Sequence, residues 1–370
     1  MSVLIDCTPL LMRSAGVKNY LYYWCRALGR CDSGGDLELF PFLGDLGGLD
    51  HERSPLGLGG TLGRLALVQL LNRTRIPLAD PWLGKARLFH CSNQVRYPPR
   101  HQKLTATIHD LTSWVLPECH KASTVAADRI FSERVLKRAD LLIAPSENTR
   151  QDAVRILGLR PESIEVILHG VPEEFFSVSQ SDMARAAERY RLPKPYLLFV
   201  GSIEPRKNLD RLLDAYAGLR PTLREEFELV LAGPRGWRYH AVAGRIAGGL
   251  PGVRHLGYVP EADLPGLTAG AAACVYPSLY EGFGFPVAQA MAAGTPVVTS
   301  PAGSLREIAG ESALYVDPLS VSSIRAEIER VLCSSHLRDE LAAGGRRRAE
   351  LFRWSRCARL SWDFFRKAQG

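Results

Sequence analysis

Residues 272–300, AACVYPSLYEGFGFPVAQAMAAGTPVVTS, are the part of the chain that decides its fold. The apolar run from Ala272 to Tyr276 predicts a buried strand, and Pro296 to Thr299 predict a second one. Between them, Pro286 opens a helix at the first position, which proline favours, and Gly294 closes it. The order strand, helix, strand is typical of a parallel sheet covered by helices.

The turn between the first strand and the helix predicts an anion site. The backbone amides of Gly282, Phe283 and Gly284 lie where the helix begins, with Phe285 directly after them. Helix-start N–H groups and the positive end of the helix dipole then face a ligand above the strand tip. Phosphate is a frequent occupant of such a site.

Two hydrogen-bonding side chains, Glu281 and Gln289, flank this turn. Helical side chains lean toward the start of their helix, so Gln289 points back toward the turn. We expect both groups to bind one ligand. The alternative is that Glu281 is only a helix-entry acid and that Gln289 is a polar surface residue.

A second cluster of polar residues lies in Gly201-Ser-Ile-Glu-Pro-Arg-Lys-Asn-Leu209, after another predicted strand. Gly201 lets a ligand approach the backbone, and Arg206 and Lys207 bring two positive charges that suit a nucleoside diphosphate. The chain contains no Asp-x-Asp pair, so we expect these two cations to take the place of a divalent metal. Alternatively, both are solvated residues at a helix start.

These two segments resemble the E-x7-E region and the basic pair of the large family 4-like group of retaining glycosyltransferases, which includes bacterial mannosyl- and glucosyltransferases. The resemblance implies the GT-B fold, an α/β fold of two doubly wound, Rossmann-like domains that face a central cleft. It also implies that Glu281 faces the donor sugar. The second acid of the motif holds the ribose, and here it is Gln289, which implies weaker ribose binding because an amide lacks the carboxylate charge.

The resemblance also assigns roles in the first half of the chain. Gly16 and Lys18 fall where the family has a loop beside the diphosphate and the acceptor, although an ordinary turn explains them equally simply. His109 ends a predicted strand and would contact the donor sugar through its ring or carbonyl, not as a general base; alternatively it is structural and capped by Asp110. His169 stands where relatives have Asn, and either borders the site or is structural.

Residues Ala302 to Glu307 form another strand-to-helix step. Relatives have a Gly-rich turn ending in Glu here. However, Ser304 followed three residues later by Glu307 also fits a capping box, and we favour that interpretation.

Length and composition restrict the class of protein. At 370 residues two domains are expected, and 46% hydrophobic residues supply two cores. A net charge of +7 fits an anionic ligand or membrane surface, but nucleic-acid-binding motifs are absent. Eight scattered cysteines indicate reduced thiols in the cytoplasm, and the N-terminus lacks the pattern of an export signal.

Strand-like runs fall into two series separated by Leu192-Pro-Lys-Pro195. We therefore predict an acceptor domain at 1–190, a donor domain at 191–352 and a final helix at 353–370 that either crosses back to the first domain or caps its own. The strands are expected at residues 3–7, 37–43, 87–91, 104–109, 141–145 and 164–168, and then at 196–200, 227–232, 253–256, 272–276, 296–299 and 313–316.

A segment from Gly60 to Ile76 alternates leucine-rich and basic positions, including Arg64, Arg73 and Arg75. An amphipathic basic helix of this kind can rest on the inner face of a membrane, although a packed surface helix is the commoner explanation. The distinction matters because lipid-linked sugars are frequent acceptors in the resembled family.

The sequence as a whole predicts a retaining, metal-independent glycosyltransferase. It would move a hexose, with mannose a candidate, from a nucleoside diphosphate sugar to a sugar or lipid-linked sugar in polysaccharide or lipopolysaccharide assembly. No cofactor is expected. Two alternatives remain open: a nucleotide-sugar epimerase, for which the acid and base carboxylates are not found, and a non-catalytic nucleotide-sugar-binding subunit, which the glutamine at 289 favours.

Overall fold

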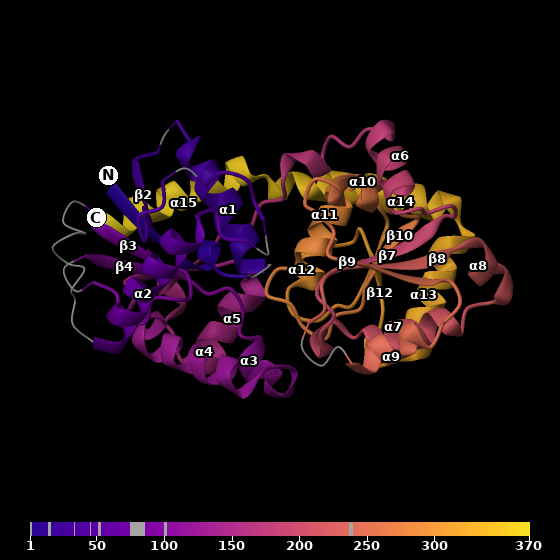
Figure 1. The fold of residues 1–370 in the computed structure, drawn as a ribbon, viewed down its shortest axis with the longest axis horizontal. Coiled ribbons are helices and arrows are strands. Elements are labelled where there is room, and N and C mark those ends of the chain that lie inside the picture. The colour runs from indigo at the N-terminus through magenta and orange to yellow at the C-terminus, as the bar shows by residue number, and fades with distance from the viewer. Residues whose placement is uncertain are drawn as a thin grey trace. The chain divides into compact units, whose positions relative to one another are not determined.

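A computed structural model describes residues 2–13, 16–32, 34–44, 46–50, 53–74, 86–99, 102–236 and 240–370. Contacts divide the chain into two units, each drawn in Figure 1. Unit 1 comprises Met1–Gly170 and Arg353–Gly370, and unit 2 comprises Val171–Phe352. Each unit contains one parallel sheet of six strands, which confirms the predicted fold class and places every predicted strand.

In unit 1 the strand order is β2-β1-β3-β4-β5-β6. Central strands such as β3 are buried along their whole length, as expected for a sheet with helices on both faces. The strands are β1 (Ser2–Asp6), β2 (Asp36–Phe40), β3 (Leu88–Cys91), β4 (Lys103–Thr107), β5 (Leu141–Ala144) and β6 (Ile164–Val166). The helices are α1 (Gly16–Gly29), α2 (Leu58–Thr74), α3 (Thr112–Val115), α4 (Ala122–Arg134), α5 (Glu147–Leu157) and α15 (Trp354–Gln369).

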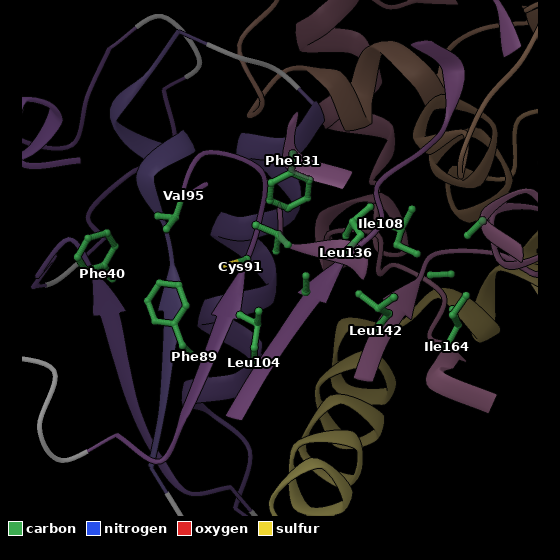
Figure 2. Close-up of a cluster of buried hydrophobic side chains, with 14 of the residues drawn as sticks. Phe40, Phe89, Cys91, Val95, Leu104, Ile108, Phe131, Leu136, Leu142 and Ile164 are labelled. Atoms are coloured by element: carbon green, nitrogen blue, oxygen red, sulfur yellow. The ribbon is translucent and has the colours of Figure 1, made fainter. Parts of the chain in front are cut away.

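One buried hydrophobic cluster of unit 1 joins side chains of the sheet to side chains of α2, α4 and α5 (Figure 2). Phe89, Leu104 and Leu142 come from three adjacent strands, and Phe131 comes from α4. All four side chains are buried. Burying side chains of this size stabilises a fold by roughly 1.5–3 kcal/mol each, so this layer fixes the strand ends that follow it.

The last helix, α15, packs on α1 within unit 1, among the indigo elements of Figure 1. The Trp24 indole donates to the Ser361 hydroxyl at 2.9 Å, and the Trp362 indole donates to the Leu28 carbonyl at 3.1 Å. Both indoles are buried, and each has a partner for its N–H group, as buried tryptophans require.

In unit 2 the strand order is β12-β11-β10-β7-β8-β9. The strands are β7 (Tyr196–Val200), β8 (Glu228–Ala232), β9 (Val253–Gly257), β10 (Ala273–Tyr276), β11 (Val297–Thr299) and β12 (Leu314–Tyr315). The helices are α6 (Gln180–Arg189), α7 (Leu209–Ala217), α8 (Pro221–Glu226), α9 (His240–Ala247), α10 (Leu264–Ala269), α11 (Phe285–Ala293), α12 (Leu305–Ala309), α13 (Val321–Cys333) and α14 (Ser335–Ala349).

The strand order of unit 2 reverses between β7 and β10, which are neighbours in the sheet. Open parallel sheets bind ligands at such a switch point, beyond the carboxyl ends of the strands. The segments that follow β7 and β10 are the two that the sequence singled out. The topology of unit 2 therefore brings them to the same place.

The division between the units falls after Gly170, whereas the sequence suggested a boundary near residue 190. The reason is α6, which packs against α10 of unit 2. A Cβ added to Gly266 on α10 would lie 2.4 Å from the Asp182 carbonyl on α6, so glycine permits this close approach.

The predicted basic helix is α2, while Arg75 and Ile76 lie outside the described residues. No helix within the described part of the chain is both long and apolar enough to span a bilayer.

Candidate functional site

Backbone contacts join the segments after β7 and β10 in unit 2. The Leu279 amide donates to the Arg206 carbonyl at 2.8 Å, and the Asn208 carboxamide donates to the Pro277 carbonyl at 3.0 Å. Arg206 and Lys207 end a 3-10 turn, Pro205–Lys207, and α7 begins only at Leu209. The basic pair is therefore held beside the β10 loop, in the turn that precedes α7.

The Glu281 carboxylate is the centre of this site. Its Oε2 lies 2.5 Å from an Arg206 nitrogen, and its Oε1 lies 2.7 Å from the Lys207 ammonium. Oε1 also accepts from the Tyr276 hydroxyl at 2.9 Å and the Ser278 hydroxyl at 2.6 Å. Burial alone would raise the pKa of Glu281, but Arg206 and Lys207 outweigh it and lower the pKa to about 2. The carboxylate is therefore ionised at neutral pH.

Lys207 is held equally closely. It is buried, and its ammonium donates to the Tyr276 hydroxyl at 2.5 Å as well as to Glu281. Burial, followed by the charge of Arg206, lowers the pKa of Lys207, while burial and Glu281 hold the pKa of Tyr276 well above its usual range. The Tyr276 phenol is thus a neutral bridge between a cation and an anion.

The charges in this cluster balance. Arg206 also pairs with Glu204 at 3.0 Å, so the two cations, Arg206 and Lys207, meet the two carboxylates of Glu204 and Glu281. Each side chain is largely buried. In the described part of the chain, no group of three or more His, Cys, Asp or Glu side chains could hold a metal ion.

The main chain of Glu281 is fixed from the opposite side by the loop after β11. Both the amide and the hydroxyl of Ser304 donate to the Glu281 carbonyl at 3.0 Å. Gly303 has φ +60°, and a Cβ there would lie 2.4 Å from the same carbonyl oxygen. The predicted capping box is therefore wrong: Ser304 precedes α12, but its hydroxyl holds Glu281 instead of capping the helix.

The glycines of the site allow close backbone approach. Gly201 has φ +148°, and a Cβ on the neighbouring Gly233 would lie 2.0 Å from the Gly201 carbonyl oxygen. Gly284, at φ +93°, precedes α11, and a Cβ there would lie 2.6 Å from Leu305. Gly282 is buried beside these contacts.

Helix α11 begins at Phe285, one residue before the predicted start at Pro286, and ends at a left-handed Gly294. Its N-terminus carries the positive end of the helix dipole, as the sequence predicted. Phe283 is buried, and its ring lies 5.1 Å from that of Phe285 and 5.7 Å from that of Phe352. The Phe283 side chain therefore packs in unit 2, and only its backbone remains for a ligand.

Gln289 is buried on α11, yet no hydrogen bond of its carboxamide is found among the described residues. It does not join the Glu281 cluster.

In unit 1, the structure places Lys18 inside the fold. Lys18 is buried on α1, and its ammonium donates to the carbonyl oxygens of Met12 at 3.1 Å and Arg53 at 2.7 Å. Burial lowers the pKa of Lys18. Gly16 is the first residue of α1, and a Cβ there would meet nothing within 4 Å.

The two predicted histidines of unit 1 meet at Tyr20. The Tyr20 ring centre lies 5.3 Å from that of His109, edge-on, and 4.2 Å from that of His169. Burial lowers the pKa of His109 to about 4 and holds the pKa of His169 well below its usual range. Both rings are neutral at pH 7. Asp110 accepts from Thr112 at the start of α3, rather than from His109.

Four contributors were missed by the sequence reasoning: Tyr276, Ser278, Ser304 as a clamp, and Tyr20. Tyr276 was assigned only to a buried strand, and its hydroxyl gave no signal by itself. A usable signal was available for Ser278, because a polar residue two positions beyond a strand end lies where parallel sheets bind ligands.

Comparison with known proteins gives family matches over both units. Residues 181–348 match the family described as glycosyl transferases group 1, and residues 15–175 match glycosyltransferase family 4. Over 263 residues the chain is 34% identical to O-antigen chain mannosyltransferase B of Escherichia coli. That match covers 70% of this chain and 69% of the relative.

Solved structures share the fold. Sucrose-phosphate synthase from Thermosynechococcus elongatus aligns with a TM-score of 0.76 at 22% identity, covering 99% of this chain and 98% of that one. The Anabaena protein Alr3699/HepE, solved in complex with UDP-glucose, aligns with a TM-score of 0.73 at 19% identity, covering 99% and 100%. At these identities the likeness concerns the fold alone.

Proposed function

We propose a specific reaction for this chain, which belongs to the group 1 and family 4 glycosyltransferases. It would transfer a hexose from a nucleoside diphosphate sugar to a hydroxyl of a sugar or lipid-linked sugar, with retention of configuration and without a metal ion. Mannose is the candidate hexose, because a relative 34% identical is named a mannosyltransferase of the O-antigen chain.

The observation that carries the proposal is the buried contact of Glu281 with both Arg206 and Lys207 at the switch point of unit 2. A carboxylate placed between two cations marks where an anion can bind, and the diphosphate of a donor would present negative charge to the same two groups. Arginine and lysine are both common phosphate ligands, arginine through two parallel hydrogen bonds.

We propose that the diphosphate replaces the Glu281 carboxylate as the partner of Arg206 and Lys207 when the donor binds. Three hydrogen bonds from Lys207, Tyr276 and Ser278 to Oε1 hold the carboxylate in place without ligand. Once the cations turn to the phosphates, Glu281 is available to the donor sugar, in the role that the family resemblance implies.

During transfer, the bond between the anomeric carbon and the phosphate oxygen breaks, and negative charge grows on the leaving diphosphate. Arg206, Lys207 and the N-terminus of α11 would stabilise this charge without reorganising. In the retaining mechanism that we propose, the leaving phosphate accepts the proton of the acceptor hydroxyl. The acceptor oxygen then bonds to the anomeric carbon on the same face.

Other assignments stay predictions within this proposal. Gln289 would hold the ribose, and the glycines at 201, 282 and 284 would line the phosphates. Gly16, Lys18, His109 and His169 of unit 1 keep their predicted substrate contacts, although Lys18 would first have to leave the carbonyls of Met12 and Arg53. The reaction would take place in the cytoplasm.

A donor screen tests the proposal. Melting of the purified full chain would be followed with UDP, GDP, ADP and their sugars, because a ligand at 100 times its Kd adds about 2.7 kcal/mol of stability. The best donor would then be incubated with sugar acceptors, with and without EDTA, and the product anomer would be assigned by NMR. Stabilisation by one nucleotide and EDTA-resistant transfer with retention are expected. An inverted product, or complete loss with EDTA that added metal restores, would overturn the mechanism.

A further inference from the structure

A buried histidine lies between the sheet of unit 1 and the two helices α1 and α15. His90 of β3 is fully buried, and its ring centre lies 5.1 Å from that of Trp24 on α1 and 5.5 Å from that of Phe365 on α15. Side chains alternate along a strand, so His90 points away from the hydrophobic cluster that contains the preceding residue, Phe89. His90 is therefore a polar residue within an otherwise aromatic layer.

Both ring nitrogens of His90 contact threonine hydroxyls of β4. Nδ1 lies 2.9 Å from the Thr105 hydroxyl, and Nε2 lies 2.9 Å from the Thr107 hydroxyl. Both threonines are as deeply buried as the histidine. Burial, followed by the nearby His109, lowers the pKa of His90 to about 3, so the ring is neutral at pH 7 and has one donor and one acceptor nitrogen. The ring cannot rotate without losing both hydrogen bonds.

His90 is connected to Tyr20 of α1 by two routes. The Thr107 hydroxyl lies 3.4 Å from the Tyr20 hydroxyl, which is a long hydrogen bond. The Trp24 ring stacks on the Tyr20 ring at 5.1 Å between centres, with an angle of 20° between the planes. Tyr20 is therefore held at its hydroxyl through Thr107 and at its ring face through Trp24, and its burial in close-packed surroundings leaves it little freedom to move.

Tyr20 extends this arrangement to the histidines of the proposed substrate site. Its ring meets His109 edge-on, and the ring of His169 lies closer, at 4.2 Å between centres. Nε2 of His109 is buried and has no hydrogen-bond partner among the described residues. In the proposed function, this nitrogen is available to a hydroxyl of the donor sugar, and its direction depends on how the His109 ring packs against Tyr20.

We propose that His90 is a positioning residue for glycosyl transfer. It fixes Tyr20 through Thr107 and Trp24, and Tyr20 in turn sets the orientation of the His109 ring toward the donor sugar. His90 is fully buried, so it acts through its neighbours and not by touching the substrate. The role in transfer rests on the proposed function, whereas the contacts among these side chains do not.

Two valine variants on β4 test the proposal. Thr107→Val removes the hydroxyl between His90 and Tyr20. Thr105→Val is the matched control, because it removes an equally buried hydroxyl that contacts the same ring on its other side. We expect Thr107→Val to lower kcat about tenfold, less than the roughly 10²-fold cost of a 1 Å misplacement, and Thr105→Val to change kcat little. The Kd of nucleoside diphosphate should stay the same in both, because its proposed cations lie in unit 2.

Two substitutions of His90 itself provide a rescue experiment. In His90→Gln the amide lies near the former Nε2 and keeps the contact with Thr107, whereas in His90→Asn it lies near the former Nδ1 and keeps only the contact with Thr105. Each variant loses the ring and one hydrogen bond, so thermal melting should show similar losses of stability. We expect His90→Gln to retain more of the kcat than His90→Asn. Equal kcat in the two variants would assign His90 a purely structural role and overturn the inference.

Imidazole spectra test the same contacts without a reaction. Long-range ¹H–¹⁵N correlation spectra of the full chain would be compared with those of the two valine variants, with the His109 signal assigned by its loss in His109→Gln. We expect the His109 signal to shift in Thr107→Val and to keep its position in Thr105→Val. An unchanged signal in Thr107→Val, or equal shifts with equal losses of kcat in both variants, would overturn the inference.

Failure of the proposed function gives a different result. If the unmodified chain transfers no sugar to any acceptor, the proposed function fails, and the role of His90 in transfer fails with it. The shift of the His109 signal in Thr107→Val would then still establish that His90 and Thr107 orient the His109 ring.

Discussion

Units 1 and 2 share one architecture but bury their polar groups in different ways. Each has a six-stranded parallel sheet whose strand order reverses next to the first strand of the unit. In unit 2, the groups beyond the strand ends are charged and paired, with Glu281 between Arg206 and Lys207. In unit 1, the histidines around Tyr20 are neutral. The sheet fixes where functional groups stand, while the side chains fix which chemistry is available there.

The difference follows from how each unit compensates the desolvation cost of burying ionisable side chains. Desolvation disfavours every charged form, by several pKa units when burial is complete. Histidine near neutral pH escapes this cost by staying deprotonated, whereas an arginine cannot and needs a carboxylate partner. In the proposed function, the cations of unit 2 would meet the phosphates and the neutral rings of unit 1 would meet uncharged sugar hydroxyls.

The largest expected effect comes from removing the charge at the centre of the unit 2 site. Glu281→Gln keeps the shape of the side chain but leaves Arg206 and Lys207 without their shared counterion. We expect transfer to fall by about 10²- to 10³-fold, the scale seen when one preorganised electrostatic group is lost. Nucleoside diphosphate should bind more tightly, because it no longer competes with a carboxylate. Initial rates and calorimetry measure the two effects.

Glu228→Gln is the matched control for this prediction. Glu228 pairs with Arg254 at 3.4 Å in the same unit, so the net charge changes equally while the Glu281 cluster stays intact. Its transfer rate should be unchanged. Weaker nucleotide binding by Glu281→Gln would contradict the exchange of cations between Glu281 and the diphosphate, and unchanged turnover would contradict a role in transfer.

Mild acid should lower the stability of unit 1 while maintaining or raising that of unit 2. The pKa of His109 is lowered from 6.5 to about 4, so between these values the unfolded chain binds a proton that the folded chain does not, and stability falls as the pH drops. At pH 5 this loss is up to about 2 kcal/mol. In unit 2, burial and Glu174 raise the pKa of Glu261 to about 7, so its contribution grows as the pH falls from 7 to 4.5.

Amide hydrogen exchange at pH 7 and pH 5, corrected for intrinsic rates, would resolve the two units. Protection of β3, β4 and β5 in unit 1 should decrease, while protection of β7, β8 and β10 in unit 2 should hold or increase. Glu281 does not reverse this contrast, because its lowered pKa, about 2, costs stability only below its ordinary value of 4.5. Equal loss in both units would show that burial of the histidines does not set the acid response.

The smallest expected effect concerns Gln289. A carboxylate at this position would accept stronger, charge-assisted hydrogen bonds from a ribose diol. We expect Gln289→Glu to tighten nucleotide binding by about threefold to tenfold, measured by calorimetry. Gln180→Glu, at the exposed first position of α6, makes the same change of charge elsewhere in unit 2. No gain at 289, or an equal gain at 180, would remove the ribose assignment.

The predictions for the fold succeeded where a pattern is continuous. Apolar runs placed every strand, because buried parallel strands have no polar positions to obscure them. Gly294 was correctly read as the end of α11, since its φ is +74°. The division after Gly170 could not be predicted, because it depends on the packing of α6 against α10.

The sequence named several residues that the structure brings together, but it did not predict their contacts with one another. Glu281, Arg206 and Lys207 were named from sequence, yet their mutual contact depends on β7 and β10 being neighbours. The spacing of Ser304 to Glu307 fits a helix cap within the local sequence. In the structure, however, the Ser304 hydroxyl donates to the carbonyl of Glu281, which is distant in the sequence. Local patterns cannot reveal a partner that is far away in the sequence.

The return of α15 to unit 1 has a consequence for synthesis. Unit 2 is an uninterrupted segment of chain, whereas unit 1 needs residues from both ends. During translation, unit 2 can therefore emerge whole while α1 still lacks its contact with Trp362 of α15. Until α15 has been synthesised, the side of α1 that it covers lacks its partner, so unit 1 completes its packing after unit 2.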